Sequence, residues 1–276
     1  MNGKSILITG CSSGIGYDAA HGLRARGWRV FAACRKEEDC ARLAGEGLET
    51  VHMDMTDAQS IRIALDEVLH ATGGTLDALY NNAAFALPGA VEDLPTDGLR
   101  AVFEANVFGL HELTRAVIPV MRAQGHGRII NCSSVLGMVV LGGRGAYAAT
   151  KFALEGLTDT LRIEMRDTPI HVITLAPGPI TSKIRENSIP HFERWIDWKN
   201  SPRRAQYEEK LLARLYEDRD QDRFELPASA VTAKLIHALE SPRPRPRYHV
   251  TTPTYLMDVL RRVLPTRTLD WLVSKG

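Results

Sequence analysis

Short apolar runs alternate with longer amphipathic stretches along most of the chain. The apolar runs end at a glycine or a polar residue, as buried strands of a parallel sheet do. The stretches between them repeat apolar residues at three- and four-residue steps, which is typical of helices that cover one face of a sheet. We therefore expect an α/β fold: a Rossmann-type, doubly wound parallel sheet of about seven strands with helices on both faces. The expected strands are residues 5–9, 28–33, 49–53, 76–80, 128–131, 170–175 and 247–250.

The chain has 276 residues, which is enough for a single domain spanning 1–276. Residues 252–276 lie beyond what the sheet needs and form a C-terminal amphipathic extension. Its apolar stripe has to be buried against something. We favour docking beside residues 182–216, so that the two segments wall an apolar pocket; a membrane surface and a second subunit stay open as alternatives. The stripe comprises Tyr255, Leu256, Val259, Leu260, Val263 and Leu264, opposed by Asp258, Arg261 and Arg262.

Composition narrows the class of protein. Hydrophobic residues make up 44% of the chain and charged residues 24%, an ordinary globular balance. The net charge of +1 argues against general nucleic-acid binding, which needs a basic patch. The four cysteines show no metal or disulfide spacing and the nine histidines do not cluster, so we expect free thiols, a reducing compartment and no catalytic metal. Because there is neither a signal-peptide pattern nor an apolar run of ~18 residues, we expect a soluble, cytoplasmic protein.

A glycine-rich turn follows the first expected strand. Gly10, Gly14 and Gly16 lie in the stretch GCSSGIG, and a helical pattern begins at Ile15. A strand, a glycine turn and a helix N-terminus in succession form an anion site, because backbone amides point at a phosphate and the helix dipole favours negative charge. The spacing GxxxGxG departs from the usual dinucleotide fingerprint. A purely structural turn therefore stays open.

The residues after the second and third strands bear on which nucleotide would fit. In dinucleotide-binding folds an acidic residue after the second strand binds the ribose 2′-hydroxyl. Here the chain reads Cys34-Arg35-Lys36. Arg35 would suit a 2′-phosphate, which its planar guanidinium can bind through two parallel hydrogen bonds, and this favours NADP(H). A solvated basic turn is the alternative. Asp54 would either meet the adenine or cap the helix that starts near Asp57.

The stretch 134–151 carries the candidate chemistry. Tyr147 and Lys151 are four residues apart, and Ser134 precedes the tyrosine by thirteen. On a helix the phenol and the ammonium share one face, and the ammonium would lower the tyrosine pKa from about 10 towards neutrality, where a general acid or base works best. Alone, this spacing also fits a core tyrosine beside a solvated lysine. Asn106 opens a further apolar-periodic helix, where a lone asparagine is usually a cap.

Taken together, these motifs resemble the short-chain dehydrogenase/reductase family in its one-domain form. They are TGCSSGIG (9–16), NNAA (81–84), Asn106, CSS (132–134), YAATK (147–151) and PGPIT (177–181), in the family's order and spacing. Within the family the chain is similar to the branch of 17β-hydroxysteroid and retinol dehydrogenases, and to bacterial NADP-dependent aldehyde reductases. Residues 182–226 carry no family motif, and the resemblance places the substrate-loop insertion there.

The resemblance implies a role for each motif residue. Tyr147 would be the acid/base, and Lys151 would lower its pKa and hold the nicotinamide ribose. Ser134 would orient the substrate carbonyl, and Asn106 would hold a water in a proton relay. Ala84 stands where the family usually has glycine and would be strained if the backbone there needs positive φ. Cofactor contacts would fall on Gly10, Ser12, Ser13, Gly14, Ile15, Gly16, Arg35, Asp54, Met55, Asn82, Ala83, Tyr147, Lys151, Pro177, Gly178, Ile180 and Thr181.

The implied function is that of an NADP(H)-dependent oxidoreductase. It would reduce a lipophilic aldehyde or ketone, or oxidise the matching alcohol, by hydride transfer. An NADP-sensing protein without catalysis is the alternative. The expected partner is a small lipophilic substrate and not a nucleic acid, while peripheral membrane contact through the C-terminal helix and a homo-oligomer stay open.

Overall fold

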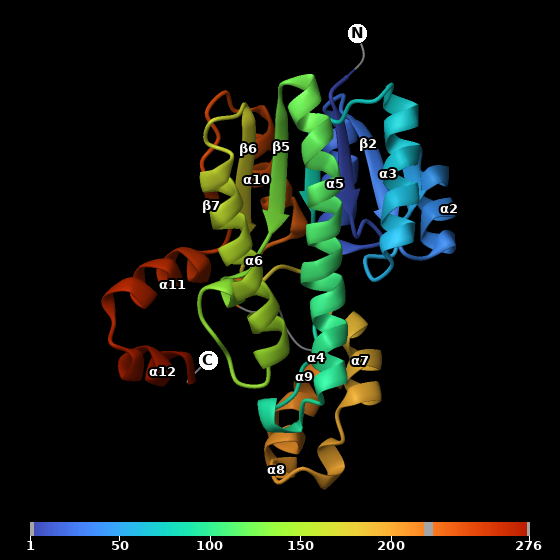
Figure 1. Cartoon of the computed structure of the whole chain (residues 1–276). Helices are drawn as coiled ribbons and strands as arrows, with labels where there is room; N and C mark the ends of the chain where they lie inside the picture. Colours follow the sequence, from blue (N-terminus) through green and yellow to red (C-terminus); the bar gives the residue numbers. More distant parts are fainter. Residues whose placement is uncertain (1–2, 218–222, 275–276) are drawn as a thin grey trace.

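The computed structural model describes residues 3–217 and 223–274, and within them seven parallel strands form one sheet (Figure 1). The order is β3-β2-β1-β4-β5-β6-β7, so the chain reverses direction across the sheet between β1 and β4. At such a reversal the loops that follow the strands diverge and leave a crevice. The predicted fold class is confirmed. The strands are β1 (Ser5–Thr9), β2 (Arg29–Cys34), β3 (Glu49–His52), β4 (Ala78–Asn81), β5 (Gly127–Cys132), β6 (Ile170–Ala176) and β7 (Arg247–His249).

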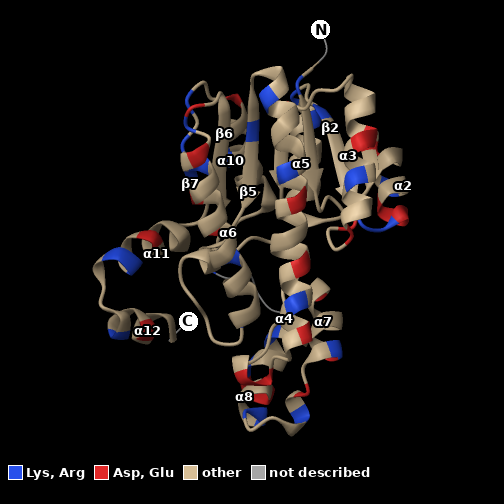
Figure 2. Ribbon diagram, in the orientation of Figure 1, with Lys and Arg blue, Asp and Glu red and all other residues tan. Residues whose placement is uncertain are grey.

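Helices cover both faces of the sheet, as the continuous apolar runs of the strands require. In β1, Ile6 and Ile8 enter one core while Leu7 enters the other. The first core is closed by α1 (Gly14–Ala25), α2 (Glu37–Gly45) and α10 (Ala228–Glu240). The second is closed by α3 (Ala58–Thr72), α5 (Gly109–Gln124) and α6 (Gly145–Glu164). Acidic and basic residues are interspersed along the outer helices (Figure 2).

The helix expected to begin at Asn106 begins ten residues earlier, so that prediction is wrong. α4 (Thr96–Phe103) continues through a π-helical turn (Glu104–Phe108) into α5. Asn106 therefore lies inside a long helix and is not an N-cap. Gly109 follows the π-turn, where an added Cβ would lie only 1.8 Å from the carbonyl oxygen of Met55. The long helix thus passes against the loop after β3, which positions Asn106 near the carboxyl ends of the strands.

A small third core lies beyond the sheet, at the lower end of Figure 1. It is built from α7 (Ile184–Trp195), α8 (Arg204–Gln206) and α9 (Leu212–Tyr216), with short turns Trp198–Asn200 and Tyr207–Leu211 between them. These pack on α4 and on the loop after β4. Its buried members are Leu87, Val102, Ala146, Phe192, Ile196, Tyr207 and Leu215. Phe192 and Tyr207 are therefore covered within this core, to which the C-terminal extension contributes no residue. The extension meets the expected segment at its other end, where Val273 and Ser274 line a cavity together with residues of 203–217.

The C-terminal extension forms two helices, α11 (Thr252–Val263) and α12 (Thr266–Ser274), which project from the side of the sheet below β7 (Figure 1). We favoured docking of the apolar stripe of α11 on the protein, and most of this stripe does not dock there. Tyr255, Leu256, Val259 and Val263 are exposed, whereas Thr251 and Thr254 are fully buried. Among the described residues, no helix is long and apolar enough to cross a membrane.

Candidate active site

A cavity of about 600 Å³ opens at the carboxyl ends of the strands, where the order of the sheet reverses. Residues from the loops after β1, β2, β3, β4, β5 and β6 line it together with α6 and α7. Of the predicted site residues, it brings together Gly10, Ser12, Ser13, Gly14, Ile15, Arg35, Asp54, Met55, Asn82, Ala83, Tyr147, Lys151 and Pro177. Gly16, Asn106, Ser134, Gly178, Ile180 and Thr181 are not among its lining residues.

The glycine turn has the backbone geometry of a phosphate cradle. Gly10 and Gly14 take φ values of +74° and +59°, which residues with side chains rarely adopt. A Cβ on Gly16 would lie 2.3 Å from the carbonyl oxygen of Gly10. Position 16 therefore has to be glycine for the start of α1 to pack this closely against the turn. Ser13 precedes α1 without a side-chain cap, which leaves the first helical amides free for an anion. The turn therefore fits a dinucleotide pyrophosphate.

Asn82 braces this turn from the neighbouring strand. Its side-chain amide donates to the carbonyl oxygens of Thr9 (3.0 Å) and Gly10 (3.2 Å), while the Thr9 hydroxyl accepts from the amides of Asn82 and Ala83. β4 is thereby fastened to the glycine turn. Ala84, next along the loop, has no positive φ, so the strain considered for it does not arise.

Arg35 and Asp54 lie at the end of the cavity formed by the loops after β2 and β3. The Asp54 Oδ1 accepts from the Thr56 amide and hydroxyl, each at 2.8 Å. It is Asp57 that caps α3, by accepting from the Gln59 amide, so the alternative in which Asp54 caps this helix is wrong. The Arg35 side chain is exposed, and its backbone carbonyl bonds to His52 Nε2 at 2.8 Å.

Tyr147 and Lys151 lie one turn apart near the start of α6, as the spacing predicts. The Lys151 ammonium donates to the carbonyl oxygen of Cys132 at 2.7 Å and lies 5.4 Å from the centre of the Tyr147 ring. This places a buried cation against the end of β5. Ser134 begins a short 3₁₀ turn, Val135–Gly137, where its hydroxyl oxygen accepts from the Leu136 amide at 3.1 Å. The same hydroxyl lies near enough to Tyr147 to lower the pKa of its phenol.

Burial is the main cause of the pKa shifts of Tyr147 and Lys151. It raises the pKa of Tyr147 well above the usual tyrosine value, and neither the Ser134 hydroxyl nor the Arg144 charge offsets it. Burial also lowers the pKa of Lys151. The net shift of the Tyr147 pKa is therefore upward, and the lowering expected from Lys151 is not among its causes. The reason is that removing the phenolate from water costs more than these neighbours return.

Asn106 holds two of the segments around the site together through hydrogen bonds. Its Oδ1 accepts from the Phe85 amide (3.0 Å), and its Nδ2 donates to the Phe85 carbonyl (2.9 Å) and to the Thr150 hydroxyl (3.2 Å). The side chain is buried, and these contacts tie the loop after β4 to α6. Phe85 in turn stacks on His191 of α7, with ring centres 3.9 Å apart.

His191 is a cavity residue that sequence reasoning missed. Burial and the charges of Arg35 and Arg194 lower its pKa. It lies in a segment without any motif, and only the fold of α7 over the strand ends brings it to the cavity. Gly178, by contrast, serves packing: an added Cβ would lie 2.1 Å from the Thr251 hydroxyl at the start of α11.

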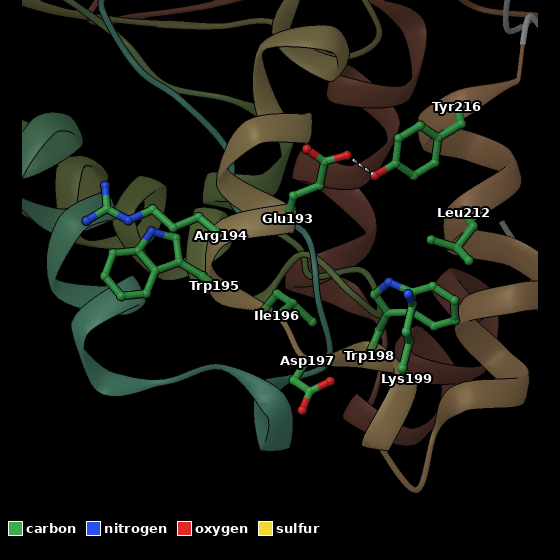
Figure 3. A pocket seen from close by; sticks show the side chains of 9 residues that line it. All are labelled: Glu193, Arg194, Trp195, Ile196, Asp197, Trp198, Lys199, Leu212 and Tyr216. Carbon is green, nitrogen blue, oxygen red and sulfur yellow. Dashed lines mark hydrogen bonds between the residues drawn. The ribbon is translucent and has the colours of Figure 1, made fainter.

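Two further hollows flank the 182–216 segment. One, of about 590 Å³, lies between the end of α7 and α9, where Tyr216 donates to Glu193 at 2.9 Å (Figure 3). None of its lining residues belongs to the predicted site. The other, of about 1380 Å³, is lined by the loops 90–92 and 141–144, by residues of 203–217, and by Val273 and Ser274 of α12.

The sequence model for short chain dehydrogenases matches residues 4–191. The chain belongs to this family. It is 39% identical over 271 residues to the uncharacterized oxidoreductase YbbO of Escherichia coli strain K12, covering 98% of this chain and 94% of that protein. It is 31% identical to rat 17-beta-hydroxysteroid dehydrogenase type 6, covering 99% and 89%.

The fold agrees with that of a short-chain dehydrogenase/reductase from Burkholderia phymatum in complex with NAD. The TM-score is 0.80 at 24% identity, and the likeness covers 99% of this chain and 95% of that one. The resemblance drawn from the motifs is therefore confirmed. The protein is an oxidoreductase of a family that binds a nicotinamide cofactor.

Proposed function

We propose that the protein is an NADP(H)-dependent reductase of lipophilic aldehydes or ketones, with Tyr147 as the acid. The observation that supports this proposal is that Tyr147 and Lys151 line one cavity together with an uncapped helix N-terminus, with Ser134 next to Tyr147. When bound, the nicotinamide cofactor supplies the hydride. The chain's own residues handle the proton and the developing charge on oxygen.

Tyr147 donates the proton to the carbonyl oxygen. Because burial raises its pKa, the phenol keeps this proton at neutral pH, as the acid of a reduction must. The Ser134 hydroxyl, which lies near the same phenol, would donate to the same oxygen and stabilise its negative charge. Lys151, anchored on the Cys132 carbonyl, keeps a cation close to the phenol.

The preference for NADP(H) rests on the charges at the end of β2. Arg35 and Lys36 both line the cavity, where a 2′-phosphate would need cations. Asp39 is the nearby acid, and its carboxylate is engaged by Arg42 at 3.1 Å. Among residues 34–39, the carboxylate that lines the cavity is therefore already paired with an arginine.

The preference for a lipophilic substrate rests on the cavity of about 1380 Å³ that is lined in part by residues 141–144, shortly before Tyr147 in the chain. Leu141, Leu211, Ala213 and Val273 contribute apolar wall to it. Arg144, at its rim, is near enough to Tyr147 for its charge to act on the phenol. An apolar tail attached to the carbonyl could therefore lie in this cavity, as could the ring system of a steroid.

The test is an activity screen of NADPH oxidation with aldehydes, ketosteroids and retinal, comparing the parent protein with Tyr147→Phe. The variant removes only the hydroxyl, so NADPH binding should persist while turnover falls by at least about a hundredfold. Cofactor binding is followed by quenching of tryptophan fluorescence. Turnover by Tyr147→Phe at the parent rate would remove the tyrosine from the chemistry.

A further inference from the structure

The helix α11 docks on the protein through its polar side. Thr251 and Thr254 are fully buried, and their hydroxyls lie 3.0 Å apart against the turn at Gly178. One turn further along, Asp258 is turned inward, with its Oδ2 4.0 Å from His249 Nε2. The Asp258 Oδ1 accepts from Arg262 at 3.1 Å. The side of the helix that carries Thr251, Thr254 and Asp258 therefore faces the body of the molecule, while the charge of Asp258 is paired within α11.

The opposite side of α11 is apolar and faces outward. Residues at steps of three and four share one side of a helix, so this side forms a continuous strip. Trp271, on the neighbouring helix α12, adds a large exposed ring. The exposed fractions are 45% for Tyr255, 50% for Leu256, 56% for Val259, 66% for Val263 and 58% for Trp271. Clustered exposure of this kind marks a surface that binds something.

The charges around this surface select its partner. Arg262 lies seven residues after Tyr255 and therefore along the same edge of α11. Its side chain is largely exposed, whereas that of Asp258 is largely buried. Arg267 of α12 is exposed as well, and Figure 2 shows basic residues at the far end of α11. An apolar strip edged by arginines complements anionic lipid headgroups above an acyl layer.

The types of exposed side chain on α11 and α12, and their small number, also favour a lipid surface as the partner. Tyrosine and tryptophan favour the interface between water and lipid, because each joins an apolar ring to a polar atom. A stable dimer needs about 800 Å² of surface from each partner. Five partly exposed side chains supply only a part of that area. A lipid surface sets no such minimum, since each apolar side chain that enters it adds to the binding.

We propose that the outward face of α11, together with Trp271, binds the surface of an anionic lipid bilayer. The helix would lie parallel to the membrane, with its apolar strip among the headgroups and upper acyl chains. The other end of the same hairpin, Val273 and Ser274, lines the cavity of about 1380 Å³. Binding would therefore hold this cavity beside the bilayer. The proposal goes beyond the proposed activity and does not depend on it.

The experiment is co-sedimentation of the full chain with vesicles of phosphatidylcholine, with and without phosphatidylserine. The double variant Leu256→Glu/Val259→Glu should lose at least about tenfold in partitioning, because two apolar side chains leave the lipid. Arg262→Gln should weaken binding only to vesicles that contain phosphatidylserine, and added salt should do the same. Ile63→Glu is the matched control, since Ile63 is 51% exposed on α3.

Two results would overturn the proposal. One is a parent protein that fails to sediment with either kind of vesicle. The other is a double variant that binds as well as the parent. If the parent instead forms a dimer that the double variant abolishes, as measured by light scattering, a second copy covers this face and the lipid assignment is wrong. Circular dichroism checks that each variant is folded, and Val263→Ser serves as a milder second variant.

Discussion

Tyr147 shows how one side chain can be held in a single protonation state. Tyr147 is half-buried in the wall of the cavity, where the surrounding protein disfavours the phenolate, while Ser134 and Arg144 favour it. The first effect is larger, so the phenol stays protonated. A protonated phenol serves a reduction directly. The reverse reaction would first have to remove this proton, so we expect oxidation of the alcohol to respond to rising pH more steeply than reduction of the carbonyl.

Arg35 is the residue on which the choice of cofactor depends. Arg35→Ala should weaken NADPH binding by about tenfold or more, because a charge-assisted pair is lost, and should leave NADH binding nearly unchanged. Titration of each nucleotide by fluorescence measures both constants. Arg62→Ala is the control, since Arg62 is an exposed arginine of α3 outside the cavity. A parent protein that binds NADH and NADPH equally would refute the preference.

At the scale of elements, local signals gave the strands, the glycine turn and the pairing of Tyr147 with Lys151. Each of these follows from residues close together in the chain, such as the apolar run of β1 or a four-residue step on α6. The direction of the Tyr147 pKa shift could not be predicted from such local signals, because burial of the phenol depends on residues from many parts of the chain. The same holds for Asn106, whose partners Phe85 and Thr150 are distant in sequence.

The orientation of α11 shows most clearly what the sequence pattern could not predict. The sequence pattern correctly gave an amphipathic helix, but the rule that the apolar side faces the protein failed. Which side docks was decided by partners elsewhere in the chain: the turn at Gly178 admits the small hydroxyls of Thr251 and Thr254, and His249 faces Asp258. The periodicity of the sequence defines an apolar and a polar side of a helix, and tertiary contacts determine which of the two packs on the protein.

The helix α12 offers a test of the cavity proposed for the substrate tail. Val273→Glu places a charge in its wall, so the KM of a long-chain aldehyde should rise by about tenfold, while that of a short aldehyde should change little. Steady-state kinetics in solution without lipid measures both. Val263→Glu is the matched control, because Val263 is exposed on α11 and does not line the cavity. Equal effects on long and short aldehydes would place the tail elsewhere.

At the scale of the molecule, one end of the sheet carries the site and the other end contributes to stability. The carboxyl ends of the strands hold the site, where polar groups are left available for ligands. The opposite end is closed by Asp77, whose carboxylate accepts from the Ser5 amide (2.7 Å) and hydroxyl (3.1 Å) and bonds to His126 at 2.9 Å. These contacts join β1, β4 and the start of β5, which are adjacent in the centre of the sheet.

The stability of the sheet should therefore depend on the charge of Asp77. Burial alone would raise its pKa, but the hydrogen bonds from Ser5 and His126 outweigh burial and lower it. A lowered pKa in the folded state stabilises the fold above the ordinary aspartate pKa, and this stabilisation is lost as the pH falls through the lowered value. At neutral pH, Asp77→Ala should reduce the free energy of unfolding by about 1–3 kcal/mol.

Urea unfolding of the parent and of Asp77→Ala, at neutral and at successively more acidic pH, measures this effect. The two curves should converge as the pH falls, because the parent loses the charge that the variant lacks. Asp66→Ala is the control, as Asp66 is an exposed carboxylate on α3. Near neutral pH the folded variant should bind NADPH like the parent, since Asp77 lies at the end of the sheet away from the site. A stability difference that stays constant at every pH would show that the variant loses packing and not the charge-dependent hydrogen bonds.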